Sequence, residues 1–218
     1  MMIMKDTIKV LVVDDHPIVR RGLTTEINLD RGMLVVGEAI DGLEAVDQYK
    51  LLNPDVVLMD LVMPNKDGIQ ATSEIITYNS EAKILVLTSF IDEEKIYDAI
   101  KAGALGFIYK DKHPDKVLEA IRDIYHDVPV LAPNITRRLM RETQSKDDHL
   151  LEQELTDRET EVLKQVASGK PYKEIAYLMH VQEATVRTHV SNILGKLNLA
   201  NRSQLVLYGV EHQLIDKE

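Results

Sequence analysis

The feature that most constrains the fold is an alternation of short apolar runs with amphipathic stretches along roughly the first 125 residues. The apolar runs are rich in valine, isoleucine and leucine without strict polar alternation, which is typical of strands buried on both faces of a parallel sheet. Five such strand–helix units in succession predict an α/β, doubly wound fold with a five-stranded parallel sheet. The predicted strands are Ile8–Val13, Met33–Gly37, Asp55–Met59, Lys83–Thr88 and Leu105–Tyr109, and the predicted helices are Pro17–Leu29, Leu43–Leu52, Gly68–Tyr78, Glu93–Ala102 and Pro114–Tyr125.

The strand pattern stops after Tyr125. We predict a short helix at Pro133–Arg141 and a linker in the polar stretch Thr143–Glu154. From Leu155 every pattern is helical, which predicts a second, small all-α domain of four helices, and 218 residues are enough for two domains. The predicted boundaries are 1–127 for the first domain, 128–154 for the linker and 155–218 for the second domain, whose helices are Asp157–Ala167, Lys173–Met179, Glu183–Leu197 and Arg202–Gln213.

The net charge of −10 is divided unevenly between the two predicted domains. From Thr156 to Glu218 there are eight basic and eight acidic residues, whereas the rest of the chain has 18 basic and 28 acidic residues. Between Ala184 and Val210 the charged residues are all basic. An acidic domain joined to one with a local basic face indicates two different functions, and the second is compatible with an acidic partner such as DNA.

Composition excludes several classes of protein. The chain has no cysteine, which excludes disulfides and thiolate metal sites and fits a reducing compartment. No apolar run approaches the ~18 residues that a membrane-spanning helix needs. Charge at Lys5 and Asp6 interrupts the first residues before a signal-peptide core could form. We therefore expect a cytoplasmic protein without a membrane partner.

Acidic and basic side chains follow the predicted strands at the points where those strands end. Asp14 and Asp15 follow the first strand, Asp60 follows the third, Thr88 closes the fourth and Lys110 follows the fifth. We expect these side chains to meet, because carboxyl ends of parallel strands share one edge of a sheet. Two carboxylates ~4 Å apart repel by about 4 kcal/mol at an effective dielectric of 20. The cluster therefore predicts a hard divalent cation, Mg²⁺, and its combination of groups suits acceptance of a phosphoryl group.

Four segments, Val12–His16, Asp60–Gly68, Leu87–Ser89 and Tyr109–Lys110, resemble the receiver domain of two-component response regulators. The resemblance implies a phosphoacceptor, with at most slow self-dephosphorylation, rather than an enzyme. It implies that Asp60 is the phosphoacceptor and that a histidine kinase is the donor. It implies that Mg²⁺ is held by the side chains of Asp15 and Asp60, by the backbone carbonyl of Val62, and by Asp14 through water. It also implies that Thr88 and Lys110 contact the phosphoryl group and that Phe107 is the switch residue. The family often has proline after the lysine, whereas this chain has Asp111, so a cis peptide bond there is not carried over.

The predicted helix Glu183–Leu197 has two contrasting faces. Val186, Val190, Ile193 and Leu197 fall on one narrow stripe, which predicts that this stripe is buried. The opposite face is small and polar and has one arginine, and such a face can enter the major groove of DNA. Its residues are Ala184, Arg187, Thr188, Ser191 and Gly195. The segment Lys173–Leu178 is the predicted supporting helix, with a turn at Met179–Gln182.

Three segments, Leu155–Glu159, Lys173–Ala176 and Thr185–Val190, resemble the LuxR-type helix-turn-helix. The two halves together resemble the NarL/FixJ class of response regulators, and Leu87–Asp92 is similar to the VraR/LiaR group. The resemblance implies double-stranded DNA as a partner and a homodimer on activation. It implies that Arg187, Thr188 and Ser191 face the bases of the DNA. It implies that the residues at or near the phosphates are Lys173, Thr185, His189 and Arg202. The helix Arg202–Gln213 is implied as a dimer contact. The chain departs from the pattern at Pro171-Tyr172, which replaces a small polar pair, and at Val181-Gln182, which replaces a turn ending in serine.

Two other functions are compatible with parts of the sequence. Asp60 could be the nucleophile of a phosphohydrolase, but Val62 occupies the position where a separate acid/base carboxylate is needed. The chain could also bind DNA without phosphorylation, although its complete acidic cluster argues against this. A phosphate-binding loop at Ala167–Lys170 is excluded, because Lys164 replaces the first glycine and Pro171 replaces the hydroxyl residue. His16 is expected at the edge of the acidic site and not as a metal ligand.

Overall fold

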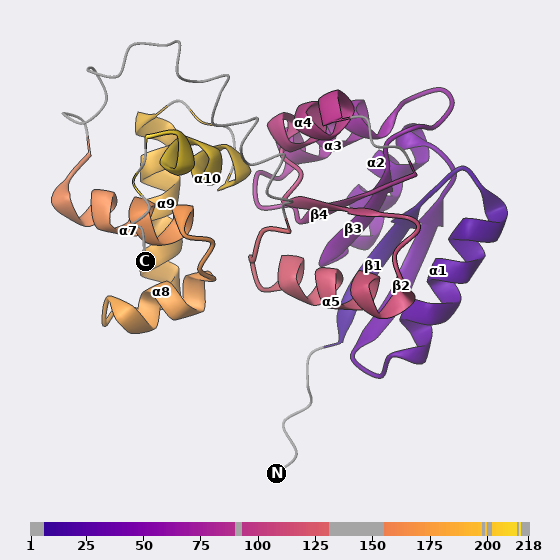
Figure 1. The fold of residues 1–218 in the computed structure, drawn as a ribbon, viewed down its shortest axis with the longest axis horizontal. Coiled ribbons are helices and arrows are strands. Elements are labelled where there is room, and N and C mark those ends of the chain that lie inside the picture. Colours follow the sequence, from indigo (N-terminus) through magenta and orange to yellow (C-terminus); the bar gives the residue numbers. More distant parts are fainter. Residues whose placement is uncertain are drawn as a thin grey trace.

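The computed structural model describes residues 7–89, 93–130, 155–197, 199, 202–212 and 214. The described residues form an α/β domain (residues 7–130) and a helical domain (from residue 155 onward), which lie side by side in Figure 1. The predicted short helix at 133–141 and the polar linker at 143–154 lie outside the described residues. None of the helices that the structure describes is long and apolar enough to cross a membrane.

The α/β domain contains one parallel sheet of five strands in the order β2-β1-β3-β4-β5. This confirms the predicted doubly wound fold. The strands are β1 (Ile8–Val13), β2 (Met33–Ala39), β3 (Val56–Asp60), β4 (Ile84–Thr88) and β5 (Gly106–Tyr109). Strand β2 continues two residues past its predicted end, because Glu38 and Ala39 still pair with β1. In the register of the sheet, Asp60 lies beside Leu87 and Thr88 lies beside Tyr109.

Helices cover both faces of this sheet. Alternate strand residues point to opposite faces, so Leu11 and Val13 pack with α2, α3 and α4, whereas Val10 and Val12 pack with α1 and α5. The helices are α1 (Pro17–Leu29), α2 (Gly42–Leu52), α3 (Gly68–Tyr78), α4 (Glu93–Ala102) and α5 (Pro114–Tyr125). Helices α1 and α5 begin with proline, whose missing N–H costs nothing in the first turn. Strands β3 and β4 are buried on both faces and β1 and β5 nearly so, as the sequence pattern predicted, whereas the edge strand β2 has exposed and partly exposed residues between its buried ends.

The helical domain contains α7 (Asp157–Ala167), α8 (Tyr172–Leu178), α9 (Glu183–Lys196) and α10 (Arg202–Glu211). The predicted apolar stripe of α9 is buried: Val186, Val190 and Ile193 are at most 1% exposed, and they pack against α7 and α8. The structure begins α8 at Tyr172, one residue earlier than predicted, because the Tyr172 ring is itself part of this core.

The first turn of α7 has a capping box that is extended by a lysine. The backbone N–H of Glu159 bonds to the Thr156 hydroxyl at 3.3 Å, and the Thr156 N–H bonds to the Glu159 carboxylate at 2.8 Å. Lys196, at the end of α9, lies 2.7 Å from the same carboxylate. Hydrogen bonds from Lys196 and Thr156 lower the pKa of Glu159 from its ordinary value of 4.5 to about 2.

Glu159→Gln is therefore expected to lower the stability of α7 by about 1 kcal/mol near neutral pH. Because the folded-state pKa of Glu159 is lowered, its contribution is present above the unfolded value of 4.5 and is lost as pH falls through about 2. Hydrogen exchange of α7 peptides in the full chain measures the difference in stability between Glu159→Gln and the unaltered chain. This difference should become smaller as the pH is lowered. Glu161→Gln is the matched control, since Glu161 is half-exposed on the same helix and forms an ion pair with the neighbouring Arg158. An equal effect of the two substitutions would show that the capping network contributes nothing.

Candidate functional site

Asp14, Asp60 and Lys110 meet at the carboxyl edge of the sheet, as the sequence predicted. Each follows or closes a different strand: β1, β3 and β5. The Lys110 Nζ atom lies 2.6 Å from Asp14 Oδ2 and 2.7 Å from Asp60 Oδ2. The side chains of Asp14 and Asp60 are buried, at 0% and 6% exposed, and that of Lys110 is mostly buried, at 11% exposed. The lysine thus joins two carboxylates that would otherwise repel each other.

Burial and charge act in opposite directions on these groups. Burial raises the pKa of Asp60 above its ordinary value, and the hydrogen bond and positive charge of Lys110 offset part of this rise. Burial also acts to lower the pKa of Lys110, but its hydrogen bonds to Asp14 and Asp60 outweigh burial and leave the pKa of Lys110 raised. Lys110 therefore stays protonated beside Asp60, and the site combines a buried carboxylate with a fixed positive charge.

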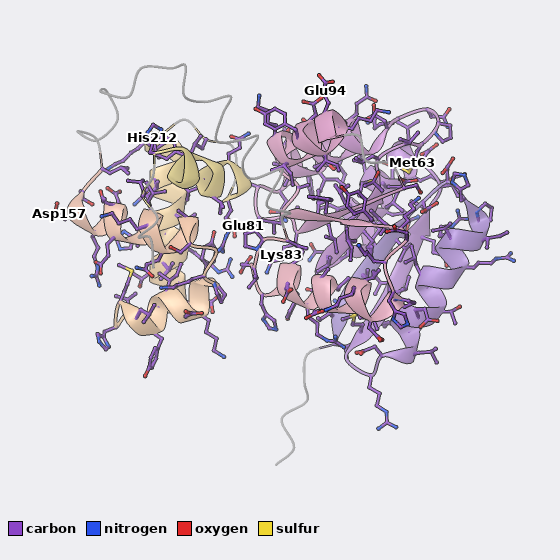
Figure 2. The ribbon with its side chains drawn as sticks, viewed as in Figure 1. Met63, Glu81, Lys83, Glu94, Asp157 and His212 are labelled. Atoms are coloured by element: carbon purple, nitrogen blue, oxygen red, sulfur yellow. The ribbon has the colours of Figure 1, made fainter. Side chains whose placement is uncertain are left out.

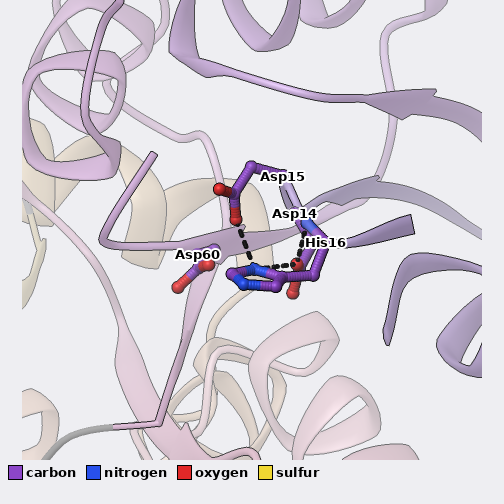
Figure 3. Close-up of side chains that lie close together, drawn as sticks. All are labelled: Asp14, Asp15, His16 and Asp60. Atoms are coloured by element: carbon purple, nitrogen blue, oxygen red, sulfur yellow. Dashed lines mark hydrogen bonds and ion pairs between the residues drawn. The ribbon is translucent and has the colours of Figure 1, made fainter. Parts of the chain in front are cut away.

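Asp15 and His16 complete the cluster on its more exposed side (Figure 3). His16 Nδ1 lies 2.6 Å from Asp15 Oδ1, and the His16 backbone N–H donates to Asp14 Oδ1 at 2.9 Å. One ligand atom from each of Asp14, Asp15, His16 and Asp60 lies within 4.8 Å of the others. The His16 side chain is 69% exposed, which agrees with its expected place at the edge of the site. His16 was not among the predicted metal ligands, and its position next to the Asp14-Asp15 pair is the sequence feature that brings it to this cluster.

The residues at this edge fit a hard divalent cation. The carboxylates of Asp14, Asp15 and Asp60 lie close together, and carboxylate oxygens are the ligands that Mg²⁺ prefers. Val62 follows Asp60 by two residues, and its backbone N–H lies 3.5 Å from Asp60 Oδ1.

Thr88 and Phe107 lie on β4 and β5, which are neighbouring strands of the sheet. Thr88 is the last residue of β4 and is 3% exposed, and its backbone carbonyl accepts the N–H of Lys110 at 2.8 Å. Phe107 is 4% exposed on β5, and its ring packs edge-on against Tyr109 with 5.5 Å between ring centroids. The candidate hydroxyl and the candidate aromatic switch are thus on adjacent strands.

The candidate DNA-contacting residues divide into two groups. Lys173, Thr185, Thr188 and Ser191 are exposed and His189 is half-buried. Arg187 and Arg202 are different, because both lie against the boundary with the α/β domain. Arg187 pairs with Glu81 of that domain, and Arg202 is 6% exposed with its Nη2 donating to the Lys170 carbonyl. In this arrangement of the domains the Arg202 side chain is buried, and its expected phosphate contact stays a prediction.

Two protein-family models match the chain. Residues 10–122 match the response regulator receiver domain, and residues 153–208 match the bacterial regulatory proteins of the luxR family. These ranges include all of the cluster residues and all of the candidate DNA-contacting residues.

Characterised relatives resemble the chain along nearly its whole length. The transcriptional regulatory protein LiaR of Bacillus subtilis is 40% identical over 210 residues, which cover 96% of this chain and all of LiaR. The response regulator VraR of Staphylococcus aureus is 40% identical over 209 residues, covering 96% of this chain and 99% of VraR. Among solved structures, the response regulator ChrA of a heme-sensing two-component system is 32% identical and aligns with 96% of this chain and 99% of its own, with a TM-score of 0.52. The chain therefore belongs to the two-component response regulators that join a receiver domain to a LuxR-type helix-turn-helix, and it is a DNA-binding transcriptional regulator.

Proposed function

We propose that Asp60 accepts a phosphoryl group from a histidine kinase and that the phosphorylated chain binds promoter DNA as a homodimer. The observation that carries this proposal is the 2.7 Å contact between Lys110 Nζ and Asp60 Oδ2 at the buried carboxyl edge of the sheet. A carboxylate held beside a fixed positive charge has the nucleophile and the electrostatic support that an incoming phosphoryl group needs.

In the proposed transfer, an Asp60 carboxylate oxygen attacks phosphorus and forms an O–P bond. The N–P bond of the kinase phosphohistidine breaks, and its electron pair returns to the histidine ring. Lys110 is in reach of the new phosphoryl oxygens and is assigned to offset their charge. Mg²⁺, held by Asp15 and Asp60, the backbone carbonyl of Val62 and Asp14 through water, would supply further positive charge to the phosphoryl group.

Phosphorylation is proposed to activate DNA binding through a conformational change of the receiver. A phosphoryl group leaves the receiver at least as acidic as before, so electrostatics alone would weaken its association with DNA. We assign the Thr88 hydroxyl to contact the phosphoryl group, which draws the segment after β4 inward and repacks Phe107. This change favours receiver dimerisation and releases the helical domain.

DNA binding is assigned to α9 and to the basic residues around it. The small, polar face of α9 suits the major groove, and dimerisation doubles the few contacts that each chain can make. A dimer contact is assigned to α10. Base contacts are proposed for Arg187, Thr188 and Ser191, and phosphate contacts are proposed for Lys173, Thr185, His189 and Arg202.

These roles assign one function to each part of the chain. Residues 1–127 are the proposed receiver, 128–154 the linker and 155–218 the DNA-binding domain. The chain acts as a phosphoacceptor in the cytoplasm, where its DNA is, and not as a turnover enzyme. The phosphohydrolase alternative has no support from a second carboxylate, because the residue two positions after Asp60 is Val62.

Footprinting of genomic promoter fragments with acyl-phosphate-treated chain tests this proposal. Treated protein is expected to protect specific sites at lower concentration than untreated protein, with a phosphoryl mass increment on the peptide that contains Asp60. Sedimentation velocity should show dimers at concentrations where DNA is bound. Equal protection with and without treatment would instead support DNA binding independent of phosphorylation, and turnover of small phosphate esters would support the phosphohydrolase.

A further inference from the structure

The segment between β1 and α1, residues 14–16, carries two of the carboxylates of the site but has no side-chain cap at the start of its helix. Helices α2 and α3 each follow an aspartate, Asp41 or Asp67, whose carboxylate accepts backbone N–H groups of the first turn. The corresponding residue of α1 is His16, whose side chain makes no such bond, and the next residue, Pro17, has no N–H. The position of this segment therefore depends on contacts from other residues.

Arg20, one turn into α1, reaches back to this segment. Its Nη1 atom donates to the backbone carbonyl of Asp14 at 2.6 Å, and its side chain is 14% exposed. The backbone N–H of Asp14 donates to the carbonyl of Ala39, at the end of β2, at 3.1 Å. Both backbone groups of Asp14 are thus held, one by the neighbouring strand and the other by the guanidinium group. The bond from Arg20 fixes the orientation of the peptide that joins Asp14 to Asp15.

Glu38 holds the Arg20 side chain in this position. Arg20 Nε lies 3.0 Å from Glu38 Oε2, and the hydroxyl of Thr24, one turn further along α1, donates to Glu38 Oε1 at 3.0 Å. Glu38 itself pairs with Val12 of β1 in the register of the sheet. A guanidinium group presents its N–H donors in a rigid plane, so it can bond a carbonyl and a carboxylate at the same time. Arg20 therefore joins α1, β2 and the segment after β1.

We propose that Arg20 is a positioning residue of the magnesium site and holds Asp14 and Asp15 in the arrangement that binds the cation. The proposal rests on the proposed function in one respect, the assignment of Mg²⁺ to these carboxylates. Mg²⁺ demands nearly ideal octahedral geometry, so a displacement of its ligands lowers its affinity. Arg20 acts through the Asp14 carbonyl and not by contact with the cation.

Charge and positioning predict opposite results when Arg20 is removed. A positive charge near the carboxylates opposes the binding of a cation, so charge alone predicts that Mg²⁺ binds more tightly after its removal. Positioning predicts that Mg²⁺ binds more weakly, because the peptide between Asp14 and Asp15 loses the donor that orients it. The direction of the change in Mg²⁺ affinity therefore distinguishes the two effects.

The place of Arg20 in the receiver keeps this test apart from the helical domain. Helix α1 lies on the side of the receiver away from the helical domain (Figure 1). Figure 2 shows Glu81 and Lys83 on the side that faces the helical domain, and Met63, from the segment that follows β3, away from it. A substitution at Arg20 therefore alters the surroundings of the acidic site without altering the residues at the boundary between the domains.

Isothermal titration calorimetry of the full chain with Mg²⁺ alone tests the proposal. Arg20→Met is expected to raise the Kd for Mg²⁺ by about 10-fold, which is the usual cost of removing a residue that orients metal ligands. Arg20→Lys keeps the charge but has a single nitrogen on a flexible stem, so it is expected to raise the Kd by less. The matched control is Arg21→Met, because Arg21 is the next residue of α1 and is exposed. It loses the same charge and should leave the Kd nearly unchanged.

Phosphoryl incorporation from acetyl phosphate gives a second readout. Arg20→Met is expected to incorporate more slowly than Arg21→Met when Mg²⁺ is limiting, and at the same rate when Mg²⁺ is saturating. A rate that stays low at saturating Mg²⁺ would indicate a general loss of structure and would overturn the proposal. So would an Arg20→Met chain that binds Mg²⁺ at least as tightly as Arg21→Met. If the unaltered chain binds Mg²⁺ but takes up no phosphate, the proposed function fails, and the Mg²⁺ affinities still decide the role of Arg20.

Discussion

Asp60→Asn is expected to abolish phosphoryl incorporation from acyl phosphates and, with it, the gain in DNA affinity after treatment. The asparagine amide is neutral and is a far weaker nucleophile than the Asp60 carboxylate, so the O–P bond cannot form. The substitution also removes the 2.7 Å ion pair between Asp60 and Lys110, which leaves Lys110 paired with Asp14. Intact-protein mass spectrometry after treatment with acetyl phosphate and Mg²⁺ measures the first loss, and anisotropy with the footprinted fragment measures the second.

Asp111→Asn is the control for this substitution. Asp111 is exposed and directly follows Lys110, so the variant makes the same chemical change next to the site without touching the buried carboxylates. It should take up phosphate as the unaltered chain does. If Asp60→Asn took up phosphate as well as Asp111→Asn, another residue would have to be the nucleophile.

The carboxyl edge of the sheet is the part of the molecule that could be predicted best from sequence. Asp14, Asp60 and Lys110 each directly follow or close a buried apolar strand, and parallel strands bring such positions together whatever the details of packing. Helix ends were predicted less well: α10 ends at Glu211 and not at Gln213. Such differences arise because periodicity marks a helix but not the residue where its last turn ends.

The contact between the domains could not be predicted in the same way. Glu81 and Arg187 are partly exposed residues 106 positions apart in the chain, and no hydrophobic period connects them. A basic side chain on a surface predicts an acidic partner, but it does not say which one, because DNA and a receiver carboxylate are both acidic. Arg202 shows the same limit, since the resemblance implied a phosphate contact but gave no sign that the side chain packs against the Tyr172 ring.

The glycine that begins α3 shows how tightly the site depends on its own backbone. A Cβ atom at Gly68 would lie 2.0 Å from the carbonyl oxygen of Asp60 and 3.0 Å from the Cα atom of Leu61. Both neighbours are backbone atoms, so no side chain can rotate away, and the chain between Asp60 and α3 must move. The sequence predicted only that a helix begins at Gly68, because closeness to the Asp60 carbonyl arises only in the folded chain.

Gly68→Ala is therefore expected to destabilise the receiver by about 3 kcal/mol and to reduce phosphoryl incorporation by displacing Asp60. Gly22→Ala is the matched control: Gly22 lies within α1, a Cβ there meets nothing within 4 Å, and alanine favours the helix by up to about 1 kcal/mol. Hydrogen exchange of peptides from β3 and α3 measures the stability of the receiver in both variants, and mass spectrometry measures incorporation. Equal stability of the two variants would mean that the backbone after Asp60 has room to move. It would contradict the conclusion that close packing at Gly68 fixes the position of Asp60.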